Sequence, residues 1–159
     1  MKPLTEQGTL TKATDVTSDR ASFDIVDLGP FDNNRNDLQA CNDHGRMAGV
    51  SLNPKTGRIE AFVQEQGERE ALGTLGGSFS IARGINNRGE VVGGSLTTGD
   101  NSFHGFLFRD DRLYDLNDLL DPAAGWELIQ AFAINNRGEI LGLGSVDGQD
   151  RIVLLRPRS

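Results

Sequence analysis

One ten-residue pattern occurs three times in the chain and limits what the chain can fold into. Residues 84–93 read GINNRGEVVG, residues 133–142 read AINNRGEILG, and residues 40–49 carry a more divergent copy, ACNDHGRMAG. Each copy places Asn, then Asn or Asp, then a basic residue and Gly between two short runs of small or apolar residues. Asn, Asp and Gly tolerate the positive φ of a tight turn between strands. The pattern therefore predicts a β-hairpin that is built three times.

Two more landmarks recur with this turn. A leucine at a strand end recurs at Leu28, Leu72 and Leu116, and both spacings, 72 − 28 and 116 − 72, equal 44. A strand with an apolar centre follows each turn, at residues 60–63, 104–107 and 151–154. These landmarks predict sequence repeats at 29–72, 73–116 and 117–157, each with about four strands. A period in the mid-forties with four strands is typical of propeller blades.

Composition agrees with an all-β class. The 159 residues include 20 glycines, and the apolar residues come in short bursts with no long helical period. This length suits one domain, expected at residues 23–159. The polar residues 1–22 are interpreted as a flexible N-terminal arm or an added remnant. We expect a propeller-like fold, with a β-prism or a β-trefoil as the alternative because both suit three repeats.

The two ends of the repeat region complement each other. Residues 23–28 resemble a fourth strand that precedes the first repeat, whereas the third repeat has three strands before residue 157. We expect residues 23–28 to lie beside residues 151–155 as a closing strand, which would cover an exposed sheet edge. The closure would occur within one chain or by exchange between two. Three blades are few for a propeller ring, so a homodimer with six blades is the expected assembly.

Several apolar positions are expected in the core because apolar alternation marks burial. Cys41 takes the repeat position of Ile85 and Ile134, so we expect it to be a small buried hydrophobe. A lone cysteine forms no disulfide within the chain. The other expected core residues are Phe62, Phe79, Ile81, Ile85, Phe106, Phe108, Leu113, Leu116, Leu119, Leu120, Leu128, Phe132 and Ile134.

Net charge argues against several partner classes. The formal charge is −7, whereas binding to nucleic acid or to an anionic membrane surface needs clustered Lys and Arg. The apolar runs are far shorter than the stretch that spans a bilayer, so no membrane insertion is expected. Residues 1–6 lack the apolar core of a secretory signal peptide, which predicts either a cytoplasmic protein or a mature chain.

A set of motifs recurs along the chain, in the runs 72–78, 84–86, 91–93 and 104–108, which contain the triplet His104-Gly105-Phe106, and in 115–120, 125–126, 133–135 and 153–155. These motifs resemble those of the HAF-repeat family of extracellular bacterial proteins, whose His-Ala-Phe triplet is matched by His104-Gly105-Phe106. The resemblance covers about residues 25–157, and the first repeat departs from it most. It implies an extracellular or cell-surface repeat protein, and it supplies no reaction or ligand.

Candidates for chemistry are few. No nucleophile, base and acid occur at a telling spacing, so no catalytic residue is predicted. The glycine-rich residues 73–77 lack the Lys-Ser or Lys-Thr of a phosphate loop and are interpreted as a connection. No EF-hand spacing is present, so no metal site or cofactor is predicted. The acidic residues Asp110, Asp111, Asp115, Asp118 and Asp121 are dense enough for a carboxylate pair, but are better explained as turn and strand-end residues.

One set of basic residues is the predicted ligand site. His44, Arg88 and Arg137 occupy the same position in the three turns, so a pseudo-symmetric fold would place them on one face. Basic side chains there could bind an anion or an acidic glycan. The first functional hypothesis is a non-enzymatic binding or scaffold module with a glycan or protein ligand. The alternatives are a polysaccharide hydrolase or lyase with paired carboxylates, and a structural fragment of a longer repeat array.

Overall fold

The computed structural model describes residues 22–31 and 37–158. By its internal contacts the chain divides into one unit at Met1–Pro30 and a second at Phe31–Ser159. Most of the predicted N-terminal arm, residues 1–21, lies outside the described residues. The described part of the first unit, residues 22–30, has no regular secondary structure.

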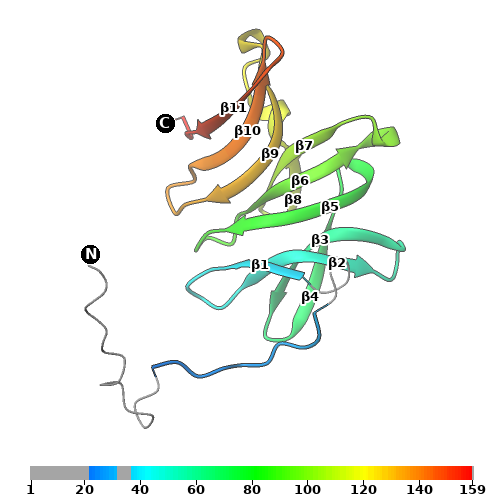
Figure 1. The fold of residues 1–159 in the computed structure, drawn as a ribbon, viewed down its shortest axis with the longest axis vertical. Helices are drawn as coiled ribbons and strands as arrows, with labels where there is room; N and C mark the ends of the chain where they lie inside the picture. The colour runs from blue at the N-terminus through cyan, green and yellow to red at the C-terminus, as the bar shows by residue number, and fades with distance from the viewer. Residues whose placement is uncertain (1–21, 32–36, 159) are drawn as a thin grey trace, which may run out of the picture. The chain divides into compact units, whose positions relative to one another are not determined.

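The described part of the second unit is all-β, as predicted, with eleven strands and three short 3-10 helices (Figure 1). Within the described ranges no helix is long and apolar enough to cross a membrane. The strands are β1 (Asp37–Cys41), β2 (Met47–Asn53), β3 (Arg58–Glu65), β4 (Glu68–Gly73), β5 (Gly76–Ile85), β6 (Val91–Thr97), β7 (Phe103–Arg109), β8 (Arg112–Asp115), β9 (Glu127–Ile134), β10 (Ile140–Val146) and β11 (Gln149–Leu155). The 3-10 helices are η2 (Thr98–Asp100), η3 (Leu116–Leu119) and η4 (Pro122–Ala124).

The strands form three antiparallel groups. Strands β1 to β4 pair in chain order, and so do β5 to β8. A single parallel bridge between Ile59 and Phe79 joins these two groups. Strands β9, β10 and β11 form a separate sheet. We refer to the groups as the first, second and third sheets, shown in cyan, green and orange in Figure 1.

The three predicted hairpins are present, between β1 and β2, β5 and β6, and β9 and β10. Each turn contains a glycine in the left-handed region, Gly45, Gly89 or Gly138, with φ of 79°, 78° and 80°. The N–H of each of these glycines donates to the carbonyl of the turn's first asparagine. Glycine adopts this conformation without the Cβ clash that other residues meet.

A β-bulge recurs opposite the glycine that ends each copy of the pattern. The pairing register shifts between Ala82 and Gly84 and between Leu38 and Ala40, and β9 shifts in the same way against β10. A Cβ added to Gly93 would collide with the Ile81 carbonyl oxygen, and one on Gly142 would lie 2.6 Å from that of Gln130. The bulge thus explains the glycine, because it brings a backbone carbonyl against that position.

Two apolar clusters lie between the sheets. One joins the first and second sheets and the other joins the second and third, and each draws on residues from both sheets. Phe62, Phe106, Phe108 and Leu116 are buried as predicted. Leu72 and Leu116, at equivalent repeat positions, belong to the first and second cluster respectively.

Three core predictions were wrong. Leu119 lies on η3 and is 45% exposed, because a short 3-10 helix continues past the buried Leu116. Phe132 occupies the bulge of β9 and points out of the pairing, which leaves it exposed. Cys41 is exposed, although Ile85 at the equivalent position is buried against the first sheet. No sheet lies on that side of the first sheet among the described strands.

The expected closing strand is not formed in this structure. Residues 23–28 have no strand conformation, and none of the described strands pairs with the outer edge of β11. A strand is stabilised by the hydrogen bonds of a neighbour, and an isolated extended segment has none.

Replacing Gly93 with Ala should destabilise the fold by about 3 kcal/mol, because the new Cβ meets a backbone carbonyl that cannot move aside. Gly105→Ala is the matched control. Its Cβ would have contacts no shorter than 3.3 Å, and the first repeat already has Ala61 there. The control should change the free energy of unfolding in urea by less than about 1 kcal/mol. Equal effects of the two changes would contradict the bulge explanation.

Candidate functional site

The first asparagine of each turn holds the turn together. The Oδ1 atom of Asn86 accepts hydrogen bonds from the backbone N–H of Arg88, at 3.1 Å, and of Glu90, at 3.0 Å. Asn42 and Asn135 make the same two bonds, each at 3.0 Å. A short side chain with both an acceptor and a donor is needed here, because the acceptor closes the turn and the donor remains free to reach beyond it.

These donors connect each turn to the next. Asn42 Nδ2 donates to the Asn86 carbonyl oxygen at 3.0 Å, and Asn86 Nδ2 donates to the Asn135 carbonyl oxygen at 3.0 Å. The following residue adds a second bond at each junction. The N–H of Asp43 donates to Asn87 Oδ1, and that of Asn87 donates to the Oδ1 of the next turn's second asparagine, both at 2.8 Å. We call this directional row of turns the asparagine relay.

The relay places His44, Arg88 and Arg137 on three adjacent turns, as the sequence predicted from their equivalent positions. The two arginines are not free. Arg88 Nη2 lies 3.1 Å from Glu90, and Arg137 Nη2 lies 2.8 Å from Glu139. An anion at this face would therefore compete with the protein's own carboxylates.

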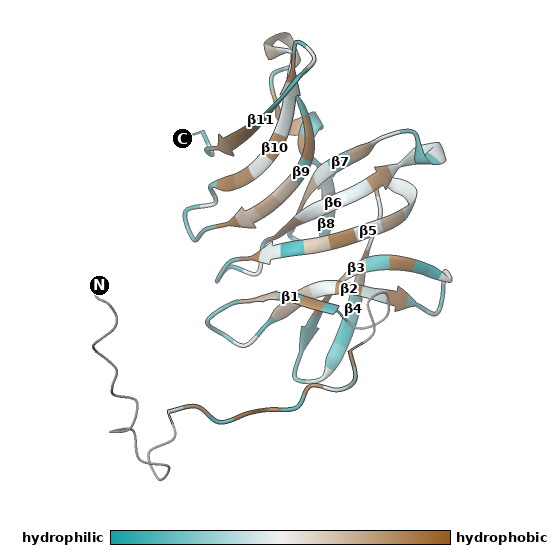
Figure 2. Cartoon of the chain, viewed as in Figure 1, coloured by the Kyte–Doolittle hydropathy of each residue, from teal (hydrophilic) through white to brown (hydrophobic). Residues whose placement is uncertain are grey.

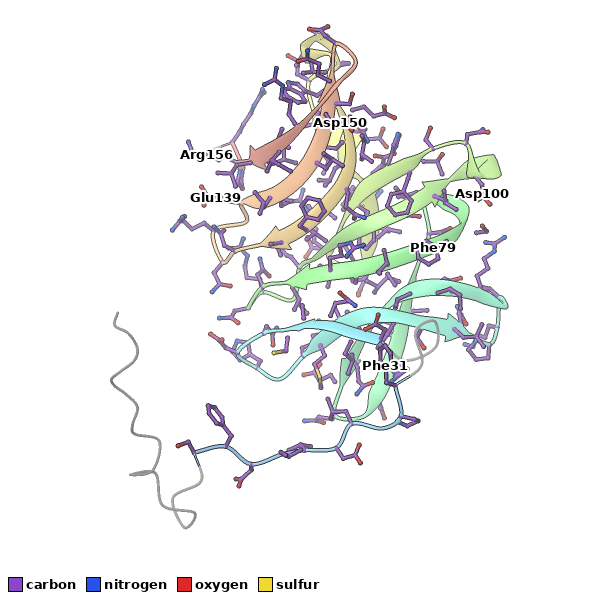
Figure 3. All side chains as sticks on the ribbon, viewed as in Figure 1. Phe31, Phe79, Asp100, Glu139, Asp150 and Arg156 are labelled. Atoms are coloured by element: carbon purple, nitrogen blue, oxygen red, sulfur yellow. The ribbon has the colours of Figure 1, made fainter. Side chains whose placement is uncertain are left out.

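The third turn shows how strongly one carboxylate is held. The side chain of Asn135 donates to Glu139, and the Arg137 guanidinium lies beside it; together they lower the pKa of the Glu139 carboxyl below its usual range. Arg156 adds a second cation at 3.4 Å, and Figure 3 shows it on the same side of the third sheet as Glu139. The side chains of Arg88 and Arg137 nevertheless remain 58% and 79% exposed, so each can still meet a ligand.

Arg46 stands where the other two turns have glutamate. It lies beside Gly89 of the next turn, and its Nε atom, 4.0 Å from Glu65, has no hydrogen-bond partner within the described part of the chain. With Arg88 it lines a depression of about 290 Å³ that also includes Phe108 and Arg109. Glu90, Asp110 and Asp111 line the same depression, so its charge is mixed and it has no clear preference for anions.

One ionisable group with two carboxylate partners was not predicted from the sequence. His104, in β7, has Nδ1 2.7 Å from Asp115 of the second repeat and Nε2 3.0 Å from Glu127 of β9. The imidazole thus bridges a carboxylate of its own sheet and one of the next. The sequence did contain a signal for His104, because this residue is the first of the triplet that matches His-Ala-Phe. The signal was not used because the other two repeats have Glu60 and Arg151 at this position.

The environment of His104 favours its charged form. Partial burial opposes the imidazolium, but the hydrogen bonds and charges of Asp115 and Glu127 outweigh burial and raise the pKa of His104 above its ordinary value of 6.5. Both ring nitrogens are engaged, so neither is positioned to take a proton from a substrate in this arrangement. His104 is a clamp between the second and third sheets.

Four of the five acidic residues between 110 and 121 form turns or cap 3-10 helices, as the turn interpretation predicted. Asp110 and Asp111 form the turn between β7 and β8 with positive φ. Asp115 and Asp121 cap η3 and η4 by accepting from the N–H groups of Asn117 and Ala123. Within the described parts of the chain, no three His, Cys, Asp or Glu side chains are grouped as metal ligands would be.

A larger depression of about 660 Å³ lies on the first sheet. It is lined by the β2–β3 turn and by Glu60, Phe62 and Arg69. The Arg69 guanidinium lies over the Phe62 ring, 4.6 Å from its centroid. Phe62 is equivalent to Phe106, which packs in the cluster between the first and second sheets. The depression therefore lies on the side of a sheet that, in the second repeat, faces a neighbour.

No protein-family model, curated protein or solved structure matches the chain significantly. The resemblance to HAF repeats accordingly rests on the sequence motifs.

Replacing Asn86 with Ala should cost about 2 to 4 kcal/mol of unfolding free energy, because a buried side chain that makes bonds both within its turn and to the next would be lost. Asn53→Ala is the control. Asn53 also supports a turn, through Glu60 and the Lys55 N–H, but it makes no bond to another repeat. It should cost about 1 kcal/mol in the same urea titration. An Asn86 effect no larger than the Asn53 effect would contradict a relay that stabilises the fold.

The His104 clamp should make stability depend on pH. Because the pKa of His104 is raised in the folded state, its contribution is fully present below about 6.5 and is lost as pH rises through the folded pKa. Urea unfolding between pH 6 and pH 9 should show this loss, and His104→Gln should remove most of it. His44→Gln, at an exposed turn position, is the control and should leave the slope unchanged. A slope that persists in His104→Gln would place its origin elsewhere.

Proposed function

We propose that this chain is a non-enzymatic binding or scaffold module of an extracellular or surface-associated protein, built from three propeller-like blades. The asparagine relay carries the proposal. It fixes three equivalent turns in one row and presents Arg88 and Arg137 at the same position of successive turns. Identical groups at a regular spacing suit a polymer with a repeating unit better than a single small molecule.

The chemistry of this face favours a glycan with acidic groups. Arg88 makes one hydrogen bond to a carboxylate, so most of its five N–H donors remain for a ligand. Asn136 lies on the same turn as Arg137; its Oδ1 accepts the Asn87 N–H, and its Nδ2 group can donate to sugar hydroxyls. A guanidinium also binds a carboxylate with two parallel bonds, which selects uronic acids over neutral sugars. A protein ligand is the other outcome of the test.

A polysaccharide hydrolase or lyase is the second candidate. The observation in its favour is the group of Asp115, His104 and Glu127, in which one imidazole touches two carboxylates and Glu127 is 54% exposed. In the binding-module proposal these residues hold two sheets together. In the enzyme proposal the carboxylates would act on a bound glycan.

The test is to measure retention of the full chain on immobilised polysaccharides, neutral and uronic-acid-bearing, while monitoring release of shortened chains. The proposal predicts retention on the acidic polymers without product, and a weakening of about tenfold or more in Arg88→Ala/Arg137→Ala. Arg58→Ala/Arg112→Ala removes the same charge at exposed strand positions and should bind as the parent chain does. No retention on any polymer would overturn the glycan proposal. Product release that stops in Asp115→Asn/Glu127→Gln would favour the enzyme.

A further inference from the structure

The third sheet exposes an apolar face that is covered in the other two. Leu141, Ile152 and Leu154 are 42%, 67% and 50% exposed. The equivalent residues of the second repeat, Val92, Gly105 and Leu107, are buried, and those of the first repeat, Ala48, Ala61 and Val63, are at most 3% exposed. Each of those faces is covered by the following sheet. Figure 2 shows the corresponding apolar colouring of β11 and of part of β10.

The first sheet is uncovered on its opposite face, the one that in the second sheet packs against the preceding sheet. In the second sheet, Ile85 and Val91 are buried in the cluster shared with the preceding sheet. Their equivalents in the first sheet are Cys41, which is exposed, and Met47, which is half-buried. The depression over Phe62 lies on this same side. The first sheet thus leaves uncovered the face that would pack against a preceding repeat. The third sheet leaves uncovered the face that would pack against a following repeat.

The two ends of the asparagine relay also fit each other. At the third turn, one N–H of the Asn135 side-chain amide donates to Glu139 of the same turn. Its second N–H and the backbone N–H of Asn136 have no acceptor among the described residues. At the first turn, the Asn42 carbonyl accepts from Gly45 of its own turn. Asp43 stands where the other two turns have the second asparagine, whose Oδ1 accepts from the preceding turn. Asp43 Oδ2 accepts from Asn87 Nδ2, and Oδ1 has no donor among the described residues. Donors therefore remain at one end of the row and acceptors at the other.

The fourth strand of the third sheet can be assigned by register. In the first and second sheets this strand is β4 or β8, with Ala71 opposite Phe62 and Asp115 opposite Phe106. The 44-residue spacing makes Asp27 the equivalent of Asp115, and Val153 is the equivalent of Phe106. Residues 23–28 on the edge of β11 would therefore set Asp27 opposite Val153.

This register brings opposite charges together. Asp115 contacts His104, two residues before Phe106, at 2.7 Å. Arg151 lies two residues before Val153, so an Asp27–Arg151 ion pair would replace the Asp115–His104 contact. Leu28 would take the position of the buried Leu72 and Leu116.

We propose that a second copy of this chain docks head to tail on the third sheet. Its residues 23–28 add to the edge of β11, and its first sheet covers Leu141, Ile152 and Leu154. Its first turn accepts the free donors of Asn135 and Asn136. The same contact formed in the other direction closes a ring of six repeats, which falls within the size of known propellers, whereas three do not. Closure uses both ends of both chains and leaves no exposed apolar face for further growth.

The first measurement is the solution mass of the full chain by light scattering and by sedimentation at decreasing concentration. The proposal predicts twice the chain mass at micromolar concentration. A monomer would overturn it and would leave closure within one chain or further repeats as the explanation of the exposed face. A mass that keeps growing with concentration would also overturn it, because an open array would then replace the closed pair.

Charge reversal tests the register and the exchange between chains. Asp27→Arg and Arg151→Asp should each weaken the dimer by at least about tenfold, since two ion pairs per dimer become like-charge contacts. An equimolar mixture of the two variants should restore the parent affinity, because every contact in the mixed dimer then pairs opposite charges. The double variant Asp27→Arg/Arg151→Asp should also recover. Asp118→Arg, on an exposed part of η3, is the control for net charge and should dimerise normally.

Comparing the mixture with the double variant distinguishes closure between two chains from closure within one chain. Recovery in the double variant without recovery in the mixture would show that residues 23–28 bind their own chain, and would overturn the proposal. No effect of either single variant would overturn the register. Both positions are exposed, so circular dichroism should show unchanged folding of each variant. The residues differ from Arg88 and Arg137, so this inference and the glycan proposal can fail independently.

Discussion

The fold depends on an asparagine that serves two purposes at once. Its side-chain Oδ1 atom accepts from two backbone N–H groups of its own turn, and its side-chain Nδ2 group donates to the backbone of the next turn. Aspartate would offer the acceptors without the donor, and serine or threonine would be too short for both bonds. This constraint links turn shape to the stacking of repeats, and it gives the row of repeats a direction. The second sheet, with a neighbour on each side, has the buried asparagine.

Contacts of three kinds join one sheet to the next or shape a sheet. The relay joins the turns, His104 joins β7 to β9, and the recurring glycine accommodates the bulge. These contacts lie on both sides of the apolar clusters and set how one sheet sits against another. Binding would then depend on side chains that project from this framework, such as Arg88 and Arg137, whose exposed ends are not required to hold the turns. The first and third sheets differ from the second because, among the described strands, each has a neighbouring sheet on one side alone.

Much of this architecture could be predicted from the sequence. The turns follow from Asn and Gly, the strands from short apolar runs, and the buried Phe62, Phe106 and Leu116 from their repeat positions. The bulge could not be predicted, because Phe132 is a large apolar residue of the kind expected in a core. Only the pairing of β9 with β10 shows that it points outward. The exposure of Cys41 depends on the absence of a covering sheet, which no local pattern encodes. The His104 clamp needs Glu127, 23 residues away in the chain, and that contact is purely tertiary.

The backbone N–H groups of Asp43, Asn87 and Asn136 report on the relay most directly. Amide hydrogen exchange by NMR should find Asp43 and Asn87 protected, because each donates to the next turn although both turns lie at the surface. Asn136 should be protected in the assembled protein and exchange freely in a dissociated variant. Rapid exchange at Asp43 and Asn87, as fast as at an exposed residue without a bond, would contradict the claim that directional bonds between turns connect the repeats.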